Sequence, residues 1–527
     1  MTESPRRILV VDNDPDVLNS VEFNLDMAGY EALTANSREA AIELLGREIV
    51  HLAIVDIRLE REDQPDDLSG FDVARKLPNY NIPCVIFTAY EDKESIRQAL
   101  GEVGAKAILD KSGSDAASQL IDIVDELFSS EVKVNLNLEI EGDLAPVGVA
   151  AQIQVPGSDQ ATADDVRQVL QTLFHDALGI HITPLLAPEP APTFTQAGSV
   201  LVRAQPRFEN ARGAPLAVKF SDRDEIMREA DNYRLIKPFL GGQRLAVLDR
   251  EAHSRQIGGL AYSLIGAGDW ETIRTFGQVF LEDNTEQVND LLERFFSQTF
   301  GALFADARRE TINLTATYTQ GLRLTPEKLQ TAAKALKLDT LTQAQLRFHG
   351  LPDSFKNPIA WALPEGRFRK FQKVSQKCLC HGDLHSQNIL VDAAGHFWLI
   401  DFGRVAESHA LRDFAELETD IKFNLLSTTD LSDLLPFERA LLAPAKFKKA
   451  PKEDMSFDDN RLNHAYQVIL ALRRIASDLL DLEDDMCEYY QALFLHTLNI
   501  MRLHHIRAEK KEHALLSASL ICQRLRD

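Results

Sequence analysis

Apolar runs that end in a polar residue mark the first quarter of the chain. The runs are residues 8–11 before Asp12, 52–55 before Asp56, 85–87 before Thr88, and 107–109 before Asp110 and Lys111. Continuous apolar runs are typical of strands buried on both faces of a parallel sheet. With a short strand at 30–33 and helical spacing between the runs, residues 1–128 predict a doubly wound α/β domain of five parallel strands and five helices. Its polar side chains would gather at the carboxyl ends of the strands, where such sheets place their sites.

Residues 129–195 predict a connecting segment. Apolar and polar positions alternate from residue 132 to 140, which is typical of a single strand. One strand is not stable alone, so it either pairs with another copy of the chain or joins a later sheet. A linker at 155–160, a helix from residue 163 and a stiff proline-rich connection at 184–192 follow.

The remaining pattern predicts an α+β region with two lobes. The first is a small antiparallel lobe over residues 196–290. Its strands are predicted at 200–202, 217–220 and 258–265. Leucine and phenylalanine at helical spacing between 291 and 304 begin a larger, mostly helical lobe over residues 291–527.

The most specific chemical pattern lies in this larger lobe. The sequence HGDLHSQN at residues 381–388 is followed by LIDFG at 399–403, and the residues between them predict a hairpin with a tight turn. Phosphoryl transfer needs a carboxylate near the acceptor hydroxyl and oxygen ligands that hold magnesium against the phosphates. Asp383, Asn388 and Asp401 supply these groups. The hairpin would carry Asn388 and Asp401 to one end of a strand pair.

These motifs resemble the aminoglycoside phosphotransferase-like branch of the protein-kinase fold. The catalytic loop of that family reads H-G-D-x-x-x-x-N and is followed by I-D-F-G. The resemblance implies a two-lobed kinase-like domain that uses ATP and Mg²⁺. It also implies that Asp383 is the catalytic base and that Asn388 and Asp401 are the magnesium ligands.

Two features of the small lobe extend the resemblance. Lys219 ends an Ala-Val-Lys pattern similar to the lysine on the third strand of kinases, and Glu229 lies ten residues later in a predicted helix. The resemblance implies that this pair orients the phosphates of ATP. Where the family has a glycine-rich loop, the chain has only Gln-Ala-Gly-Ser at 196–199, so Gly198 is the candidate phosphate-covering residue.

The amino-terminal domain resembles the CheY-like receiver domain of two-component response regulators. The resemblance implies that Asp56 accepts a phosphoryl group and that Asp12 and Asp56 bind a magnesium ion, with Asn13 as a further residue of the site. Thr88 would follow the phosphoryl group, and Lys111 would be its cationic partner. Such a group needs a metal and a lysine to screen its negative oxygens, so the set is chemically coherent. A sensor histidine kinase is the expected phosphodonor.

The receiver pattern has four departures from the family. Asn13 stands where a second acid is usual, and the loop at 57–69 is long and acidic and lacks the common early proline. Ile108 occupies the position of an aromatic switch residue, and Ser112 replaces a proline. Phosphorylation of Asp56 remains the expectation, whereas the family's usual signalling face does not follow from these residues.

The bulk composition argues against some classes of binding partner. A net charge of −23 argues against nucleic acid or an anionic membrane surface, because both attract faces rich in lysine and arginine. Five cysteines in 527 residues do not form a disulfide framework, and no segment has membrane-spanning length or the form of a signal peptide. A cytoplasmic protein is therefore expected.

The general layout of the kinase-like core is also similar to a kinase-like ternary complex associated domain of bacterial conflict systems. The strand at 258–264, Gly-Gly-Leu-Ala-Tyr-Ser-Leu, contributes to this resemblance. It implies partners that include a signalling protein that hydrolyses nucleoside triphosphates.

Two functional hypotheses follow. In the first, a receiver phosphorylated on aspartate regulates an ATP- and magnesium-dependent phosphotransferase in a two-component signalling system. In the second, the receiver is fused to a pseudokinase scaffold that acts through protein partners. If the enzyme is active, its phosphoacceptor is a protein hydroxyl, a small alcohol or an antibiotic, and the sequence does not distinguish these three.

Overall fold

The computed structural model divides the chain into two compact units. Unit 1 is Met1–Arg228 with Val247–Ser263, and unit 2 is Glu229–Ala246 with Leu264–Asp527. The structure describes residues 5–525 apart from 61–66, 90–96, 98, 157–159, 186–197, 241–245, 265, 267–269, 337–342, 448–454, 481–484 and 505. Part of the acidic loop after Asp56, most of the proline-rich connection and the two residues before Gly198 therefore lie outside the described residues.

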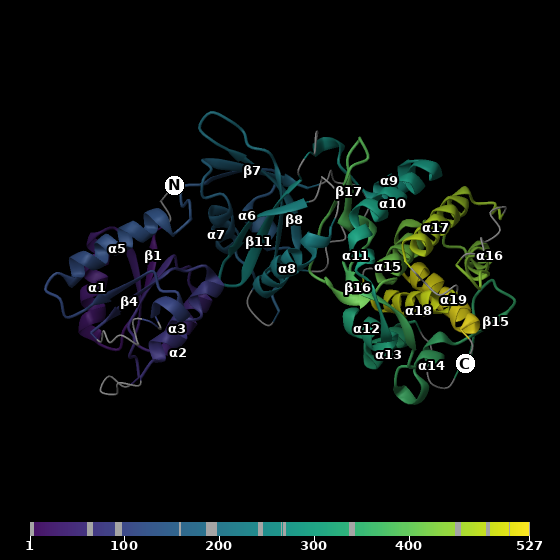
Figure 1. The fold of residues 1–527 in the computed structure, drawn as a ribbon, viewed down its shortest axis with the longest axis horizontal. Helices are drawn as coiled ribbons and strands as arrows, with labels where there is room; N and C mark the ends of the chain where they lie inside the picture. Colours follow the sequence, from purple (N-terminus) through teal and green to yellow (C-terminus); the bar gives the residue numbers. More distant parts are fainter. Residues whose placement is uncertain are drawn as a thin grey trace. The chain divides into compact units, whose positions relative to one another are not determined.

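Unit 1 begins with a five-stranded sheet whose pairings are all parallel, in the order β2-β1-β3-β4-β5 (Figure 1). Its elements are β1 (Arg7–Val11), α1 (Pro15–Met27), β2 (Glu31–Ala35), α2 (Arg38–Arg47), β3 (Leu52–Val55), α3 (Ser69–Ala74), the 3₁₀ helix η1 (Leu77–Tyr80), β4 (Cys84–Thr88), the π-helix η2 (Ala99–Val103), β5 (Ala107–Asp110) and α5 (Ala116–Ser130). This architecture confirms the predicted doubly wound domain.

The two faces of this sheet are covered by different helices. Helices α1 and α5 pack on one face through Leu25 and Val124, and α2 and α3 pack on the other through Leu45 and Phe71. Helix α1 begins after Asp14, whose carboxylate accepts a hydrogen bond from the Asp16 N–H. Burial on both faces is why the strands are continuous apolar runs.

Unit 1 also contains a six-stranded mixed sheet in the order β10-β11-β9-β8-β7-β6. Its strands and helices are β6 (Glu139–Gly142), α6 (Pro146–Ala150), α7 (Ala163–Leu173), β7 (Gly179–Pro184), β8 (Val200–Arg207), β9 (Leu216–Asp222), α8 (Arg223–Ile236, which runs into unit 2), the 3₁₀ helix η3 (Lys237–Phe239), β10 (Ala246–His253) and β11 (Ile257–Leu264). Strands β6 and β7 are parallel, whereas β7, β8, β9 and β11 pair antiparallel in turn. Helix α7 and the sheet share one hydrophobic core.

The predicted strand at 132–140 is wrong over most of its length. Only β6, from Glu139, is a strand, and it joins the six-stranded sheet, which was one of the two alternatives. Before it, Asn135 donates its backbone N–H to the Gln171 carbonyl (2.9 Å) and its side-chain amide to Ala177 (2.6 Å). One of these hydrogen bonds goes to α7 and the other to the segment after it. The Asn135 backbone N–H is therefore not available to a neighbouring strand, and tertiary contacts override the alternating pattern.

The helix predicted from residue 163 is confirmed as α7. Thr162 accepts the Asp165 N–H, and the Asp165 carboxylate accepts the Thr162 N–H in return, which forms a capping box. The six-stranded sheet takes β6 and β7 from the segment before residue 195, so the predicted lobe boundary at 195 falls inside one sheet.

Unit 2 is mostly helical and contains three small sheets, with orders β12-β17-β18, β13-β16-β19 and β14-β15 (Figure 1). Its elements are the 3₁₀ helix η4 (Trp270–Thr272), β12 (Arg274–Thr275), α9 (Phe276–Glu282), α10 (Thr285–Thr299), α11 (Gly301–Ala305), β13 (Arg308–Asn313), α12 (Leu314–Gly321), α13 (Pro326–Ala335), β14 (Gln345–Arg347), β15 (Ser354–Lys356), α14 (Pro358–Ala362), η5 (Pro364–Gly366), β16 (Gln372–Cys380), η6 (Ser386–Asn388), β17 (Ile389–Val391), β18 (Phe397–Leu399), β19 (Ala406–His409), α15 (Arg412–Asp420), the π-helix η7 (Ile421–Leu425), α16 (Leu431–Leu442), α17 (Asn460–Leu479), α18 (Cys487–Arg502) and α19 (Ala508–Arg524).

The phenylalanine-rich helix predicted at 291–304 is divided between α10 and α11. Its rings are buried, and Phe296 stacks on Phe414 of α15 with ring centroids 4.3 Å apart. Phe304 stacks on the same ring at 5.5 Å. This aromatic packing fixes the position of α15, which the next section shows to be the support of the HGD loop.

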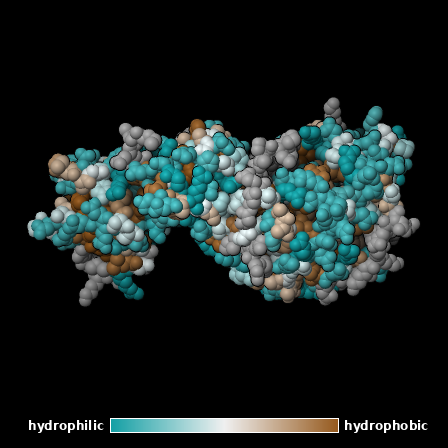
Figure 2. Space-filling model, turned by 90° about the horizontal axis from the view of Figure 1, so that it is seen from above, coloured by the Kyte–Doolittle hydropathy of each residue, from teal (hydrophilic) through white to brown (hydrophobic). Residues whose placement is uncertain are grey.

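The surface shown in Figure 2 is largely hydrophilic, with apolar residues in small separate patches. Large exposed apolar side chains include Phe23 and Met27 of α1 and Val374 of β16. Among the described residues, no helix combines the length and the hydropathy that a membrane span requires.

Candidate functional site

Asp12, Asp56 and Lys111 meet at the carboxyl ends of β1, β3 and β5. The Lys111 Nζ lies 2.7 Å from Asp56 Oδ2 and 2.5 Å from Asp12 Oδ2. Both carboxylates are almost fully buried. The structure therefore brings together three of the five predicted receiver residues as an ion-paired cluster.

Burial and pairing oppose each other in this cluster. Burial raises the pKa of Asp12 above its ordinary value although Lys111 acts in the other direction. Burial alone would lower the pKa of Lys111, but Asp56 and Asp12 outweigh it and raise that pKa. A lysine held as a cation between two acids can screen the added charge of a phosphoryl group on either of them.

The other predicted receiver residues lie around this cluster. Thr88 is completely buried at the end of β4, and its carbonyl accepts the Lys111 N–H (3.0 Å). Asn13 follows Asp12 on the turn before α1. Within the described residues, no group of three or more His, Cys, Asp or Glu side chains is arranged around a metal position. Carboxylate oxygens are suitable Mg²⁺ ligands, and Asp12 and Asp56 supply them at this position.

Gly70 is a site residue that the sequence did not reveal. A Cβ added at Gly70 would lie 1.8 Å from the Asp56 carbonyl oxygen, and the Gly70 N–H donates to Ile57 (2.8 Å). Only glycine permits α3 to approach the Asp56 backbone this closely. The sequence shows a glycine at this position, but its close approach to the Asp56 backbone is visible only in the structure.

The hairpin predicted between the two kinase-like motifs is confirmed. Strands β17 and β18 pair antiparallel, with Ile389 opposite Leu399. The Ile400 N–H donates to the Asn388 carbonyl (3.1 Å), so Asn388 and Asp401 lie at the same end of the hairpin. The predicted magnesium ligands are therefore brought together by local sequence alone.

Three carboxylates on one face of α15 hold the HGD loop. Asp413 accepts the N–H groups of His381 (2.9 Å) and Gly382 (2.8 Å). Glu416 accepts the Leu384 N–H (3.2 Å), and Asp420 accepts the Ser386 N–H (2.8 Å). Spacings of three and four residues place the acids on one helix face. Their role was not predicted, since more than thirty residues separate each acid from the N–H that it binds.

The loop backbone needs glycine at position 382. Gly382 has a φ of +78°, and a Cβ there would lie 2.3 Å from the Arg404 carbonyl oxygen. Asp383 follows directly and is nearly fully buried. Its Oδ1 lies 3.0 Å from Arg404 Nη1, so the carboxylate of the predicted base has a fixed cationic neighbour.

The arrangement of Asn388 and Asp401 fits a bound magnesium ion. The Asn388 amide nitrogen donates to the Asp383 carbonyl (2.8 Å), which leaves its oxygen, the atom that ligates hard cations, with no donor from the described residues. Asp401 has a φ of +67°, a strained value for a residue with a side chain. Such strain persists only where the surroundings impose it, as they do in ligand-binding loops.

The predicted small-lobe residues are placed on three elements. Lys219 lies buried on β9, opposite Leu201 of β8 and Leu260 of β11. Gly198 has a φ of +118° and forms an isolated bridge with Ile153. Whether Lys219 and Glu229 act as a pair on ATP stays a prediction.

Glu229 has a contact that the sequence did not predict. Its carboxylate accepts the Phe402 N–H (3.4 Å), and Asn232, one turn later on α8, donates to the Phe402 carbonyl (3.0 Å). Tyr233 packs edge-on against the Phe402 ring at 5.1 Å. One face of α8 thus holds the backbone and ring of the residue that follows Asp401.

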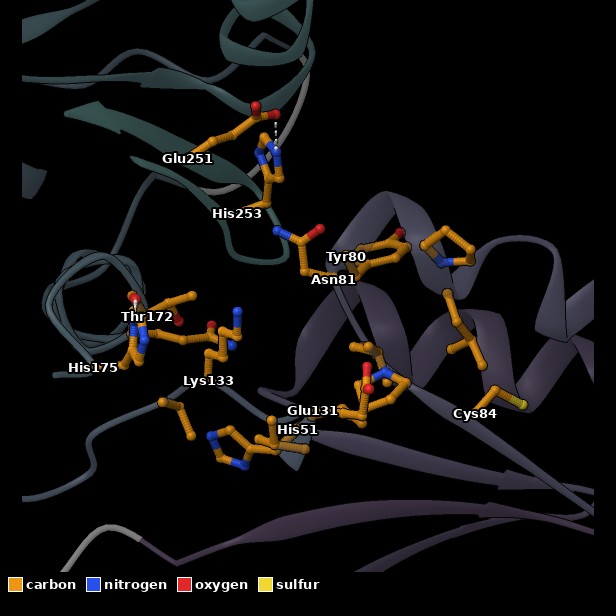
Figure 3. A pocket seen from close by; sticks show the side chains of 18 of the residues that line it. His51, Tyr80, Asn81, Cys84, Glu131, Lys133, Thr172, His175, Glu251 and His253 are labelled. Atoms are coloured by element: carbon orange, nitrogen blue, oxygen red, sulfur yellow. Dashed lines mark hydrogen bonds and ion pairs between the residues drawn. The ribbon is translucent and has the colours of Figure 1, made fainter. Parts of the chain in front are cut away.

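A cavity of about 820 Å³ lies inside unit 1, away from both sets of residues. Figure 3 shows Tyr80 and Asn81 on one side and His253, bonded to Glu251 (2.9 Å), on the other. Its receiver-domain lining, which includes His51 and Cys84, comes from the amino ends of the strands, whereas Asp56 follows a carboxyl end. The receiver domain therefore borders the six-stranded sheet at the end opposite Asp56.

Comparison with known proteins gives three matches to family models. Residues 8–125 match the response regulator receiver domain, residues 207–423 the phosphotransferase enzyme family, and residues 355–502 the ternary complex associated domain 9. The last two overlap over the HGD loop and α15.

Individual relatives match the amino-terminal domain. The heme response regulator HssR of Staphylococcus aureus strain Newman is 39% identical over 90 residues, which are 16% of this chain and 38% of that protein. A receiver domain protein from Methanospirillum hungatei is 25% identical, with 24% of this chain and 97% of that chain covered and a TM-score of 0.22. A response regulator from Thermotoga maritima is 22% identical, with 24% and 100% covered and a TM-score of 0.21.

The family matches agree with the resemblances found in the motifs. The chain carries a response regulator receiver domain, a domain of the phosphotransferase enzyme family and, overlapping that domain, a ternary complex associated domain.

Proposed function

We propose that the protein is an ATP- and magnesium-dependent phosphotransferase regulated by its receiver domain. The observation that carries the proposal is the geometry of the HGD loop and the hairpin that follows it. Asp383 lies on a loop whose backbone is held by three acids of α15, and Asn388 and Asp401 share one end of the β17–β18 hairpin. A carboxylate with two adjacent oxygen ligands is the set that phosphoryl transfer requires.

Each residue has a defined task in this proposal. Bound ATP and Mg²⁺ would supply the transferable phosphoryl group and the charge that neutralises its oxygens. Asn388 and Asp401 would hold the cation through their side-chain oxygens. Asp383 accepts the proton of the acceptor hydroxyl as that oxygen bonds to phosphorus, and a nucleoside diphosphate leaves. The bonds from α15 fix the loop, so Asp383 needs no reorganisation before it reacts.

Phosphorylation of Asp56 is the proposed regulatory input. A sensor histidine kinase would donate the phosphoryl group, as it does for receiver domains in general. Lys111 already lies 2.7 Å from the Asp56 carboxylate and supports the added charge. Such a modification usually changes the local charge and thereby shifts the equilibrium between two conformations of a nearby segment.

The junction inside unit 1 supports a route for this signal. Arg223, the first residue of α8, lies over the Tyr80 ring of η1 at 4.5 Å. Arg255, in the turn between β10 and β11, donates to the Arg47 carbonyl at the end of α2 and is anchored by Asp165 (2.8 Å). A change in the receiver domain could therefore act on the first residue of helix α8.

Magnesium-dependent nucleotide binding tests the proposal. We expect the full chain to bind a non-hydrolysable ATP analogue in isothermal titration calorimetry when Mg²⁺ is present. Asp401→Asn should weaken that binding about tenfold or more, because a metal ligand loses its charge. Asp433→Asn, an exposed acid on α16, is the matched control and should bind like the wild type.

The opposite result favours the scaffold hypothesis. If the wild type binds no nucleotide with or without Mg²⁺, both before and after phosphorylation of Asp56, the phosphotransferase proposal fails. The search would then turn to protein partners of a receiver fused to a pseudokinase.

A further inference from the structure

Two arginines lie directly on the HGD loop. Arg404 pairs with the Asp383 carboxylate (3.0 Å), and Arg412, at the start of α15, donates to the Gly382 carbonyl (2.7 Å). The side chain of Arg404 is 37% exposed, whereas Arg412 is buried. The exposed cation thus lies next to the group that would meet the acceptor hydroxyl.

Two further arginines come from the end of α12 and the end of α18. The Arg412 guanidinium packs on Gly321, where a Cβ would lie 3.0 Å from its Nη2. The next residue, Leu322, accepts a hydrogen bond at its carbonyl from Arg502 (3.0 Å). Arg323 follows with an exposed side chain and a φ of +50°, in the position after a helix where glycine is favoured. A continuous set of contacts therefore links Gly382 to Arg502.

Arg404 is paired with Asp383, whereas the other three arginines of this cluster have no carboxylate partner among the described residues. These three, Arg323, Arg412 and Arg502, lack such an ion pair in the described part of the chain although the protein has a net charge of −23. A buried arginine elsewhere in unit 2, Arg473, lies 2.5 Å from Glu418. Burial first, and then the charges of Arg404 and Arg323, lower the pKa of Arg502. Like charges that share a site are costly, and a bound anion would reduce that cost.

A neutral histidine lies beside the same cations. His496 of α18 is 3% exposed, and its Nε2 has no hydrogen-bond partner among the described residues. Burial, and then Arg412 and Arg404, lower the pKa of His496 to about 3, so the ring is neutral at pH 7. A buried polar atom without a partner is costly, and it indicates a position where a ligand or water can supply the missing bond.

We propose that Arg323, Arg404 and Arg502 bind a phosphate or carboxylate group of the acceptor, so that the substrate phosphorylated at Asp383 is an anionic hydroxyl compound. This inference rests on the proposed phosphotransferase function. Guanidinium groups recognise phosphate and carboxylate by paired, planar hydrogen bonds and remain charged at every physiological pH. Guanidinium groups beside Asp383 disfavour a cationic acceptor such as an aminoglycoside.

Binding of small anions to the full chain tests the inference. The probes are inorganic phosphate and glycerol 3-phosphate, with glycerol and kanamycin as uncharged and cationic hydroxyl compounds. Calorimetry is performed with the Mg²⁺ complex of the ATP analogue present in excess, so that the anions do not enter the nucleotide site. We expect saturable binding of the two anions and none of glycerol or kanamycin.

Variants locate the binding in the cluster. Arg323→Ala removes an exposed side chain and Arg502→Gln keeps a donor for the Leu322 carbonyl, so both should fold. Each should weaken glycerol 3-phosphate binding about tenfold and leave the affinity for the ATP analogue within twofold of wild type. Arg439→Ala, at an exposed arginine paired with Asp353, is the matched control and should change neither affinity.

The outcomes separate this inference from the proposed function. Absence of saturable anion binding, tighter binding of kanamycin, or equal affinities in the cluster variants and the control would overturn the anionic-acceptor inference while nucleotide binding stands. Absence of nucleotide binding would overturn the phosphotransferase proposal. The anion titration repeated without nucleotide would still decide whether the arginine cluster binds anions.

Discussion

The strongest structural prediction concerns Asp413, whose two carboxylate oxygens accept the N–H groups of His381 and Gly382. In Asp413→Asn, one oxygen becomes an NH₂ group that faces a backbone donor. One charge-assisted hydrogen bond is lost and a buried N–H is left unpaired, which costs about 2–4 kcal/mol in local stability. Every 1.4 kcal/mol corresponds to a factor of ten, so exchange of these amides through local opening should become about 30- to 700-fold faster.

Hydrogen–deuterium exchange of peptides covering residues 378–388 measures this effect directly, and Glu416→Gln is its internal comparison. Loss of hydration and the nearby Asp383 charge raise the pKa of Glu416 well above its ordinary value, so glutamine resembles a protonated form that the wild type readily adopts. We expect Glu416→Gln to change exchange of the Leu384 amide by less than about tenfold. Equal exchange in Asp413→Asn and wild type would refute the support that α15 is inferred to give the loop.

Four further predictions concern the receiver domain and the core of unit 2. Gly70→Ala places a Cβ 1.8 Å from the Asp56 carbonyl oxygen, so overpacking of about 3 kcal/mol should lower the melting temperature of the receiver transition by about 10 °C in calorimetry. Acetyl phosphate should label the wild type with an acid-stable, base-labile phosphoryl group that Asp56→Asn lacks, and label on Asp56→Asn would reject that acceptor. Lys111→Ala should retain Asp56 but lose most of the label, since the charge 2.7 Å away is removed. Glu438 is fully buried. Burial alone would raise the pKa of its carboxyl group, but the neighbouring Lys422 acts in the other direction, and the pKa falls to about 2. A carboxyl group with a depressed pKa stabilises the fold above pH 4.5, and this stabilisation is lost as the pH falls toward 2. The free energy of unfolding in urea should therefore be higher for the wild type than for Glu438→Gln at neutral pH, and the difference should shrink by about 3 kcal/mol over this pH range.

Local patterns account for the parts of the fold that the sequence predicts well. The strands of the receiver domain are apolar because both of their faces are covered, and the β17–β18 hairpin follows from a turn with Asp392 and Gly395. The capping box at Thr162 likewise specifies the start of α7. In each case the determining residues lie within a few positions of one another, where periodicity and turn chemistry act.

Long-range contacts account for the parts that the sequence does not predict. The alternating segment before β6 is held by Gln171 and Ala177, about forty residues away, and so is not a strand. The support of the HGD loop by Asp413 and the contact of Glu229 with Phe402 also join distant segments. Such partners are decided by packing of whole elements, and no local pattern reports them.

The central claim is that Asp383 is the base of a working phosphotransferase, and transfer of label from γ-labelled ATP tests it most directly. The full chain is incubated with Mg²⁺ and labelled ATP, with an anionic hydroxyl compound as acceptor, beside Asp383→Asn and the control Asp433→Asn. We predict label on the acceptor or turnover of ATP in the wild type and the control, and a loss of about a hundredfold or more in Asp383→Asn. Equal transfer by Asp383→Asn and wild type would contradict the account.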